Sequence, residues 1–273
     1  MHRSLFGTAL LFATCAAVAC SSDSDPATGG PGNTKDAGGD TDAPLTTDPF
    51  CRGRPLLPFC EDFDDRPLPG AFTETAGDQT LLTVSEDTTA PSPPKILKIA
   101  RAAGSSGSVW LRTSKMQRSS KCNAFFRVRL DSLGEEIELA AFAEENGHRV
   151  ALVVGKDGTV GVREPASFID AGAGSDADAD GGADGGAPSA LRMSTVKLEV
   201  GAWASVRWDI RFVGGVARTR LRVGSATAFD AEPLGLTGTD AIERMEIGAE
   251  ATTPATGAFA FAIDSVTFEP NAE

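Results

Sequence analysis

The chain has 273 residues, of which 41% are hydrophobic and 23% charged, and its formal net charge at pH 7 is −13. This acidity argues against nucleic acid as a partner, because contacts to phosphate groups need concentrated positive charge. Beyond the first twenty residues, no apolar stretch approaches the roughly 20 residues that a membrane-spanning helix needs. The length suits one folded domain with additional segments.

Residues 1–19 have the composition of an export signal. The apolar run Leu5–Val18 is shorter than a membrane-spanning helix, and the small residues Ala17 and Ala19 precede Cys20. The segment resembles a bacterial lipoprotein signal peptide, in which Cys20 matches the acylated cysteine, although that family favours leucine at the position of Ala17. The alternative is an ordinary signal peptide cleaved after Ala19. The resemblance implies a lipid anchor in the cell envelope, and we expect the outer membrane of a Gram-negative bacterium.

Two segments are rich in small and acidic residues and poor in apolar ones. Residues 20–49 contain six aspartates and one lysine, and residues 170–190 contain five aspartates, so each has a net charge of −5. Such compositions cannot bury enough apolar surface to offset the entropy of ordering, so we expect a disordered linker and a disordered insert. The remaining domain, residues 50–270, then carries a net charge of only about −4.

Alternation of apolar and polar residues with period two predicts strands along this domain. It is clearest in Ala124–Leu130, Val206–Phe212 and Arg218–Val223. Further runs predict strands at Thr80–Val84, Ile96–Ala100, Val109–Thr113, Ile137–Phe142, Val150–Val154, Val160–Arg163, Met193–Val200, Met245–Ile247 and Phe259–Phe268. Residues 135–146 suit a helix as well as a strand. About a dozen antiparallel strands without βαβ units predict an all-β fold, a two-sheet jelly-roll sandwich.

Several short motifs follow one another along the domain. It opens with Phe59-Cys60-Glu61-Asp62-Phe63-Asp64 and closes with Phe261-Ala262-Ile263-Asp264-Ser265-Val266-Thr267-Phe268. Between them lie an F-x-x-x-N-G turn before Arg149–Val154, then Gly201-Ala202-Trp203 and Glu246-Ile247-Gly248-Ala249. In this order the motifs resemble the concanavalin A-like lectin/glucanase jelly roll, a group that includes laminin G-like modules. The resemblance covers residues 59–268 and implies the same fold as the alternation.

This fold carries binding modules, hydrolases and lyases alike, so function must be read from a site. Retaining glycosidases of the family place acids on one strand in a pattern close to E-[I/L]-D-x-x-E, with two carboxyl groups about 5–5.5 Å apart. The nearest match here starts with Glu136 and Glu138, but Ala141 takes the place of the acid/base residue. After signal removal, His148 is the only histidine. We therefore predict no catalytic residue and lean towards a protein that is not an enzyme.

A glycan-binding module would present an aromatic platform on a polar sheet face. The chain has no tyrosine and three tryptophans. Trp208 alternates with core positions, whereas Trp110 shares its face with Arg112, which makes these two the candidate ligand contacts. The ordinary alternative is a packed Trp110.

A second face of interest is basic. We call it the arginine face, and it consists of Arg207, Arg211, Arg218, Arg220 and Arg222. Such a face suits anionic sugars or lipid headgroups. The ordinary alternative is a solvated strand face in which each arginine pairs with a carboxylate.

The family resemblance also implies a metal. In many jelly-roll lectins and carbohydrate-binding modules, a structural calcium joins the first strand to the last. Glu61, Asp62 and Asp64 match the opening strand and Asp264 the closing strand. Oxygen ligands of this kind suit a hard cation, so we expect a structural calcium there. The alternative is turn capping by the same carboxylates.

Three cysteines remain once the signal and Cys20 are set aside. They are Cys51, Cys60 and Cys122, and an oxidising compartment favours one disulfide among them. A Cys51–Cys60 bond would close a short proline-rich loop, whereas a Cys60–Cys122 bond would join the opening strand to a neighbour. We favour Cys60–Cys122.

These features together predict an envelope lipoprotein whose jelly-roll domain binds a glycan or another envelope component without catalysis. Its partners would be the membrane, through the lipid, and a glycan or surface protein. Two alternatives stay open. One is a polysaccharide-cleaving glycoside hydrolase of the glucanase type, and the other is a purely structural or adhesive surface protein.

Overall fold

The computed structural model describes residues 50–54, 56–114, 119–144, 148–164, 190–237, 242–251 and 257–271. The predicted signal peptide, the linker at 20–49 and nearly all of the insert at 170–190 lie outside the described residues. All described residues belong to one compact unit of the chain. Within them, no helix is long and apolar enough to cross a membrane.

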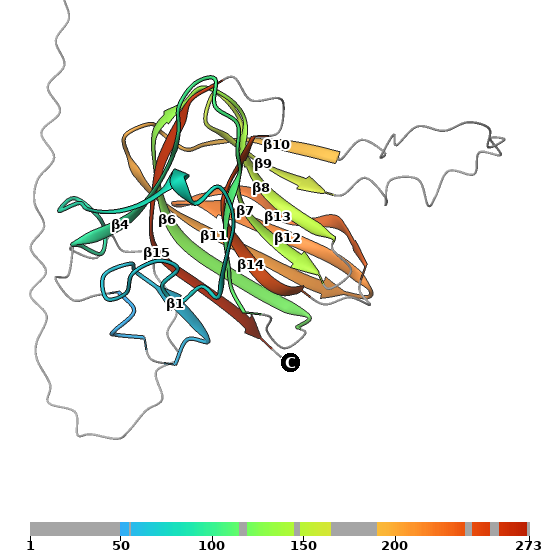
Figure 1. The fold of residues 1–273 in the computed structure, drawn as a ribbon. Coiled ribbons are helices and arrows are strands. Elements are labelled where there is room, and N and C mark those ends of the chain that lie inside the picture. Colours follow the sequence, from blue (N-terminus) through green and yellow to red (C-terminus); the bar gives the residue numbers. More distant parts are fainter. Residues whose placement is uncertain are drawn as a thin grey trace, which may run out of the picture. The chain divides into compact units, whose positions relative to one another are not determined.

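Fifteen strands and one short 3-10 helix make up the described part of the domain (Figure 1). The strands are β1 (Phe59–Glu61), β2 (Glu74–Gly77), β3 (Leu82–Glu86), β4 (Lys95–Arg101), β5 (Val109–Arg112), β6 (Lys121–Leu133), β7 (Ile137–Glu144), β8 (Arg149–Val154), β9 (Thr159–Glu164), β10 (Ala190–Lys197), β11 (Trp203–Val213), β12 (Val216–Val223), β13 (Ala226–Thr237), β14 (Ile242–Ala251) and β15 (Phe259–Asn271). The helix η1 spans Gln79–Leu81. The predicted all-β class is confirmed.

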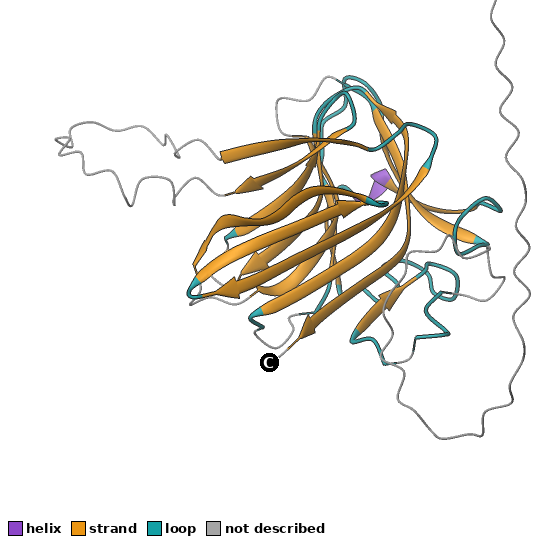
Figure 2. Cartoon of the chain, turned by 180° about the vertical axis from the view of Figure 1, so that it is seen from behind, coloured by secondary structure: helices purple, strands orange, loops and turns teal. Residues whose placement is uncertain are grey.

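The strands form two antiparallel sheets, seen from opposite sides in Figures 1 and 2. The eight-stranded sheet has the order β13-β12-β11-β6-β15-β4-β3, and β1 also pairs with β15. The seven-stranded sheet has the order β10-β9-β8-β7-β14-β5-β2. Neighbours in space are often distant in sequence, as β6 and β15 are, which is typical of a jelly roll rather than of a simple meander.

One hydrophobic core fills the space between the sheets. It takes the alternate residues of most strands, as the period-two pattern predicted, including Phe126, Phe142 and Phe268. Trp208 is fully buried there, and its Nε1 donates a hydrogen bond to Thr219 Oγ1 at 2.8 Å. The prediction that Trp208 belongs to the core is confirmed.

The turns follow from local chemistry. Val213 pairs with Val216 across a two-residue turn, in which Gly214 and Gly215 both have positive φ angles of 61° and 79°. A two-residue hairpin of this kind needs positive φ at both positions, which glycine adopts without steric cost. The hairpin fixes the register of β11 against β12.

Two sequence-based expectations about elements need revision, and one open alternative is decided. The predicted strand Thr80–Val84 starts late, because Asp78 accepts a hydrogen bond from Thr80 N and caps η1. Of the helix and the strand that residues 135–146 allowed, the strand forms, as β7 over 137–144. Strand β13 was not predicted, because it is an edge strand with register shifts that tolerates Pro233 and lacks regular alternation.

Candidate functional site

The outer face of the seven-stranded sheet, on the side away from the core, carries the candidate site. On β14, Met245 and Ile247 point into the core, which places Glu246 and Gly248 on the outer face. Trp110 and Arg112 lie opposite these two residues on β5. The predicted pair Trp110 and Arg112 therefore does share an outward face.

Arginines and glutamates alternate across this face in a continuous chain of ion pairs. Arg112 Nη1 lies 2.9 Å from Glu74 Oε1, and its Nε lies 2.9 Å from Glu246 Oε1. Glu246 also binds Arg149 Nε at 2.8 Å, and Arg149 then contacts Glu138.

The chain of ion pairs continues onto β9. Arg163 Nη1 donates to Glu138 Oε1 at 2.9 Å, and its Nη2 donates to Glu136 Oε1 at 2.6 Å. We call this set of side chains the Arg–Glu ladder; in the order of its contacts it consists of Glu74, Arg112, Glu246, Arg149, Glu138, Arg163 and Glu136. Its long side chains span the space above Ala141 and Ala151, which pair with each other on β7 and β8.

Trp110 packs within the ladder instead of forming an open platform. Its register partner on β14 is Gly248, and a Cβ atom at that position would lie only 2.8 Å from Trp110 Cε3. On the ring itself, Arg149 Cζ lies 4.2 Å from the centroid. Nε1 donates to Glu250 Oε2 at 3.3 Å. Trp110 is only 5% exposed, so the platform hypothesis is wrong, because Arg149 covers the ring that a sugar would need.

The ladder also bears on catalysis. Glu138 uses both carboxylate oxygens on arginines, and Glu136 is paired with Arg163. Ala141, at the position of the missing acid/base residue, pairs with Glu246 in register and lies on the same outward face. Glu136 and Glu138 are therefore both held in ion pairs by arginines of the neighbouring strands.

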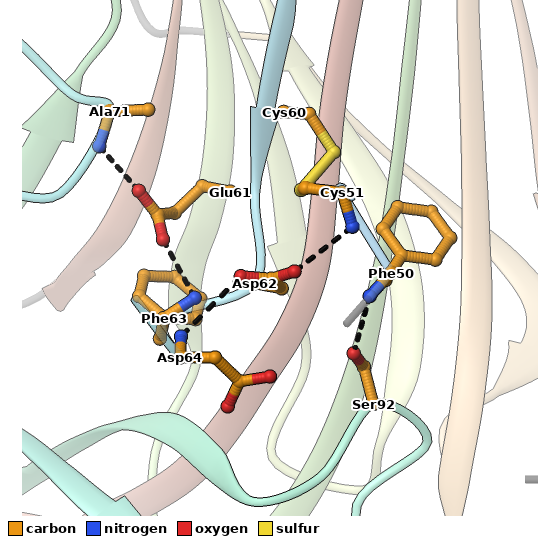
Figure 3. Close-up of a disulfide and its surroundings, with 9 residues drawn as sticks. All are labelled: Phe50, Cys51, Cys60, Glu61, Asp62, Phe63, Asp64, Ala71 and Ser92. Carbon is orange, nitrogen blue, oxygen red and sulfur yellow. Dashed lines mark hydrogen bonds between the residues drawn. A yellow bond between two sulfur atoms is a disulfide. The ribbon is translucent and has the colours of Figure 1, made fainter. Parts of the chain in front are cut away.

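The opening motif is built around backbone capping, as Figure 3 shows. Glu61 accepts hydrogen bonds from Phe63 N, at 2.7 Å, and from Ala71 N. The pKa of Glu61 is raised above its ordinary value, because the effect of burial exceeds that of these two hydrogen bonds, which lower it. Asp62 accepts from Cys51 N at 2.9 Å (Figure 3) and from Asp64 N at 3.4 Å.

The other two predicted calcium ligands lie against the first residue of β4 and the segment before it. Asp64 Oδ1 accepts from Lys95 N at 2.8 Å, and Asp264 Oδ2 accepts from Ser92 N at 2.7 Å. In the described part of the chain, no group of three or more acidic, histidine or cysteine side chains could hold a metal ion. The four carboxylates do not form the common oxygen cage that calcium needs. A calcium requirement stays a prediction that the geometry does not support.

The disulfide joins Cys51 to Cys60 (Figure 3), so the expected Cys60–Cys122 bond is wrong. The reason is the strand order: β1 and β6 pair with opposite edges of β15, which separates Cys60 from Cys122 by a whole strand. Two strand spacings amount to roughly 9–10 Å, beyond the reach of a disulfide. Cys122 is instead a buried thiol, and burial raises its pKa to about 12.

A pocket lies elsewhere, against the edge strand β3. Its lining consists of Asp65, Arg66, Pro67, Leu68, Val84, Ser85, Glu86 and Lys95. None of the predicted site residues takes part in it.

Arg149, Arg163 and Glu246 are site residues that sequence reasoning missed. Each has outward parity on a predicted strand or, for Arg149, directly before one, which was a usable signal. Their assembly with Arg112 depends on the order of the strands in the sheet, and alternation carries no information about that order.

Solved structures with a similar fold include domain 4 of AbnA, a GH43 extracellular arabinanase from Geobacillus stearothermophilus, in complex with arabinotriose. It matches with a TM-score of 0.52 and 15% identity over 79% of this chain and 93% of that one. The likeness is one of fold, a sandwich of two antiparallel β-sheets. An alginate lyase from Klebsiella pneumoniae matches with a TM-score of 0.49 and 9% identity, covering 69% and 84% of the two chains. A Trypanosoma rangeli sialidase in complex with sialic acid matches with a TM-score of 0.42 and 14% identity, covering 67% and 26%. No protein-family model and no curated protein matches this jelly-roll chain.

Proposed function

We propose that the protein is a lipid-anchored envelope protein whose jelly-roll domain binds a glycan through the Arg–Glu ladder, without cleaving it. Cys20 carries the lipid, residues 20–49 act as a flexible tether, and the outer membrane of a Gram-negative bacterium is the location. The arabinotriose complex of the similar arabinanase domain shows that one domain of this fold binds a sugar, which supports the choice of ligand class.

The observation that carries the binding proposal is the ladder itself. It presents several planar guanidinium and carboxylate groups in fixed positions on one sheet face, held by mutual ion pairs. Such groups donate and accept hydrogen bonds in defined directions, which is what the hydroxyl groups of a sugar require. The same ion pairs support a function without catalysis, since they occupy the carboxylates that a glycosidase would direct at its substrate.

The charge balance of the ladder narrows the ligand class to neutral glycans. Arg112, Arg149 and Arg163 are matched by four glutamates, Glu74, Glu136, Glu138 and Glu246, and Arg244 Nε adds a contact to Glu246 at 3.6 Å. The sum is close to zero, so the face offers an anionic polymer no net attraction.

Affinity electrophoresis in gels that contain a polysaccharide tests the proposal. We expect arabinan or another neutral glycan to retard the full chain, and alginate, an anionic polymer, to have no effect. Arg112→Ala should abolish the retardation, because Arg112 is a quarter exposed and holds both Glu74 and Glu246 in position. Arg220→Ala is the matched control, an ion-paired arginine on the other sheet, and should migrate as the parent does.

The outcomes are distinct. Binding through the ladder would be refuted if Arg112→Ala were still retarded. It would also be refuted if no neutral glycan retarded the parent. Release of reducing ends from arabinan or β-glucan would instead establish the hydrolase alternative.

A further inference from the structure

The arginine face lies on the outer side of the eight-stranded sheet, where it sets like charges directly against one another. Arg207 pairs in register with Arg222, and Arg211 pairs with Arg218. On its other side, Arg211 pairs with Lys121 of β6. Like charges in directly opposed positions repel and destabilise a sheet. Such rows therefore need anions from elsewhere to balance them.

The described carboxylates supply only part of that balance. Arg220 binds Asp230 at 2.8 Å, and Arg218 donates to a backbone oxygen, that of Ala231, at 3.0 Å. Among the residues that the structure describes, no carboxylate forms an ion pair with Arg211 or Arg222, both of which are exposed. Two further acids lie on this face, Asp209 and Glu269. They pair in register with Asn123 from its two sides, in the row between the Arg207–Arg222 row and the Arg211–Arg218 row. The solvated, fully paired face that the sequence also allowed is not what forms.

Guanidinium groups and aromatic rings extend the face at the point where the folded domain begins. Phe50 stacks on Phe125 of β6 with ring centroids 5.9 Å apart. Arg54 Cζ lies 3.9 Å from the centroid of Phe50, and Arg127 Cζ lies 6.0 Å from it. Arg207 Cζ lies 5.8 Å from Phe125. Burial and the nearby charges of Arg127 and Arg207 lower the pKa of Arg54, which agrees with a convergence of cations.

The covalent attachment of the tether decides which anion this face meets. Phe50 is the residue that follows the segment 20–49, so the tether leaves the domain from the arginine face itself. The tether of the proposed function, if it behaves as a flexible coil of thirty residues, has a root-mean-square span of about 30 Å, so an anchor on Cys20 would hold this face near the bilayer. The remainder of the chain is acidic and would be repelled by an anionic surface, which orients the domain with its basic face towards the lipid.

We propose that the arginine face, with Arg54, Arg127 and the rings of Phe50 and Phe125, docks on the phosphate-bearing headgroups of the membrane to which the chain is tethered. The inference rests on the tether of the proposed function and is independent of its glycan site. Docking leaves the Arg–Glu ladder, on the other sheet, turned away from the lipid.

Vesicle sedimentation tests the docking with a full mature chain that carries Cys20→Ser and therefore has no lipid. We expect it to bind vesicles of phosphatidylethanolamine with a quarter of phosphatidylglycerol, not to bind pure phosphatidylcholine, and to be released by salt. The double variant Arg211→Gln/Arg222→Gln should lower the partition coefficient about 30-fold, at roughly 5-fold per cation. Both side chains are exposed and face like charges, so the variant should have the thermal midpoint of its parent or a slightly higher one.

A matched double variant removes two cations from the other sheet. Lys156→Gln/Lys197→Gln should bind the anionic vesicles as the parent does, because both lysines are exposed and lie at the β8–β9 turn and on β10. Equal loss in the two double variants would overturn the proposal, and so would equal binding to both kinds of vesicle. Absence of binding would overturn it as well, whether the acidic linker or solvent covers the face. None of these outcomes bears on the retardation by glycans in gels, so either proposal can be refuted without the other.

Discussion

Asp264 is a carboxylate that the fold removes from water completely. It is 0% exposed on β15, where Oδ2 accepts a hydrogen bond from Ser92 N and Oδ1 has no hydrogen-bond partner among the described groups. Burial raises its pKa from the ordinary 3.8 to about 7, although Arg127, opposite it on β6, acts in the other direction. A proton on Asp264 therefore stabilises the folded chain at mildly acidic pH.

The sign of the resulting pH dependence follows from proton binding. Between about pH 4 and pH 7 the folded chain keeps a proton on Asp264 that the unfolded chain has lost, so the free energy of unfolding falls as pH rises through this window. Denaturant titrations at several pH values should show that fall. Asp264→Asn should flatten it and stabilise the domain at neutral pH, by up to about 3–4 kcal/mol.

The control for this residue is Asp65→Asn. Asp65 is exposed and its ion pair with Arg52 is long, at 3.7 Å, so its replacement should leave the slope unchanged. A slope that persists in Asp264→Asn would assign the titration to another group.

At the scale of elements, one buried ion pair and the hydrogen bonds of its arginine join four segments at one end of the sandwich. Arg101, the last residue of β4, pairs with Glu135 in the β6–β7 connection, and their side chains are only 1% and 9% exposed. The guanidinium also donates to Gly107 O at 3.2 Å and to Gly257 O, just before β15, at 3.4 Å. These contacts fix the ends of strands that belong to different sheets.

Removing one member of this pair should leave an uncompensated buried charge. We expect Arg101→Met to lower the free energy of unfolding by about 3–5 kcal/mol, and the double variant Arg101→Met/Glu135→Leu to regain most of the loss. Arg220→Met breaks a pair whose side chains are 41% and 67% exposed, and should cost less than about 1 kcal/mol. Chemical denaturation measures all three. Similar costs for the buried and the exposed pair would contradict the argument.

At the scale of the whole molecule, the fold could be predicted because most strands place one face in a single core. The alternation of Val206, Trp208 and Ile210 with polar residues requires that arrangement, and these three residues are fully buried. The edge strand β13 could not be predicted in this way, since an edge strand needs no regular alternation. The sheet class was therefore predictable, and the exact strand inventory was not.

The sites depend on strand order, which local patterns do not contain. Cys122 shares the parity of the core residue Phe126 and is buried as it is, but whether it bonds Cys60 could not be deduced without knowing that β15 lies between β1 and β6. In the same way, Trp110 was correctly assigned to an outward face, but Arg149, which covers it, comes from a strand two places beyond its neighbour β14.

The disulfide connects the fold to the way in which the whole molecule is anchored. Cys51 and Cys60 close the loop through which the chain enters the domain, next to Phe50 on the arginine face. Closing a loop of this length should stabilise the folded chain by about 2–3 kcal/mol, chiefly by restricting the unfolded state. We therefore expect a reducing agent to lower the thermal midpoint of the parent. Cys51→Ser/Cys60→Ser should have the lower midpoint already and be insensitive to the agent, whereas Cys122→Ala should remain sensitive. Loss of sensitivity in Cys122→Ala would instead mean that Cys122 takes part in the bond.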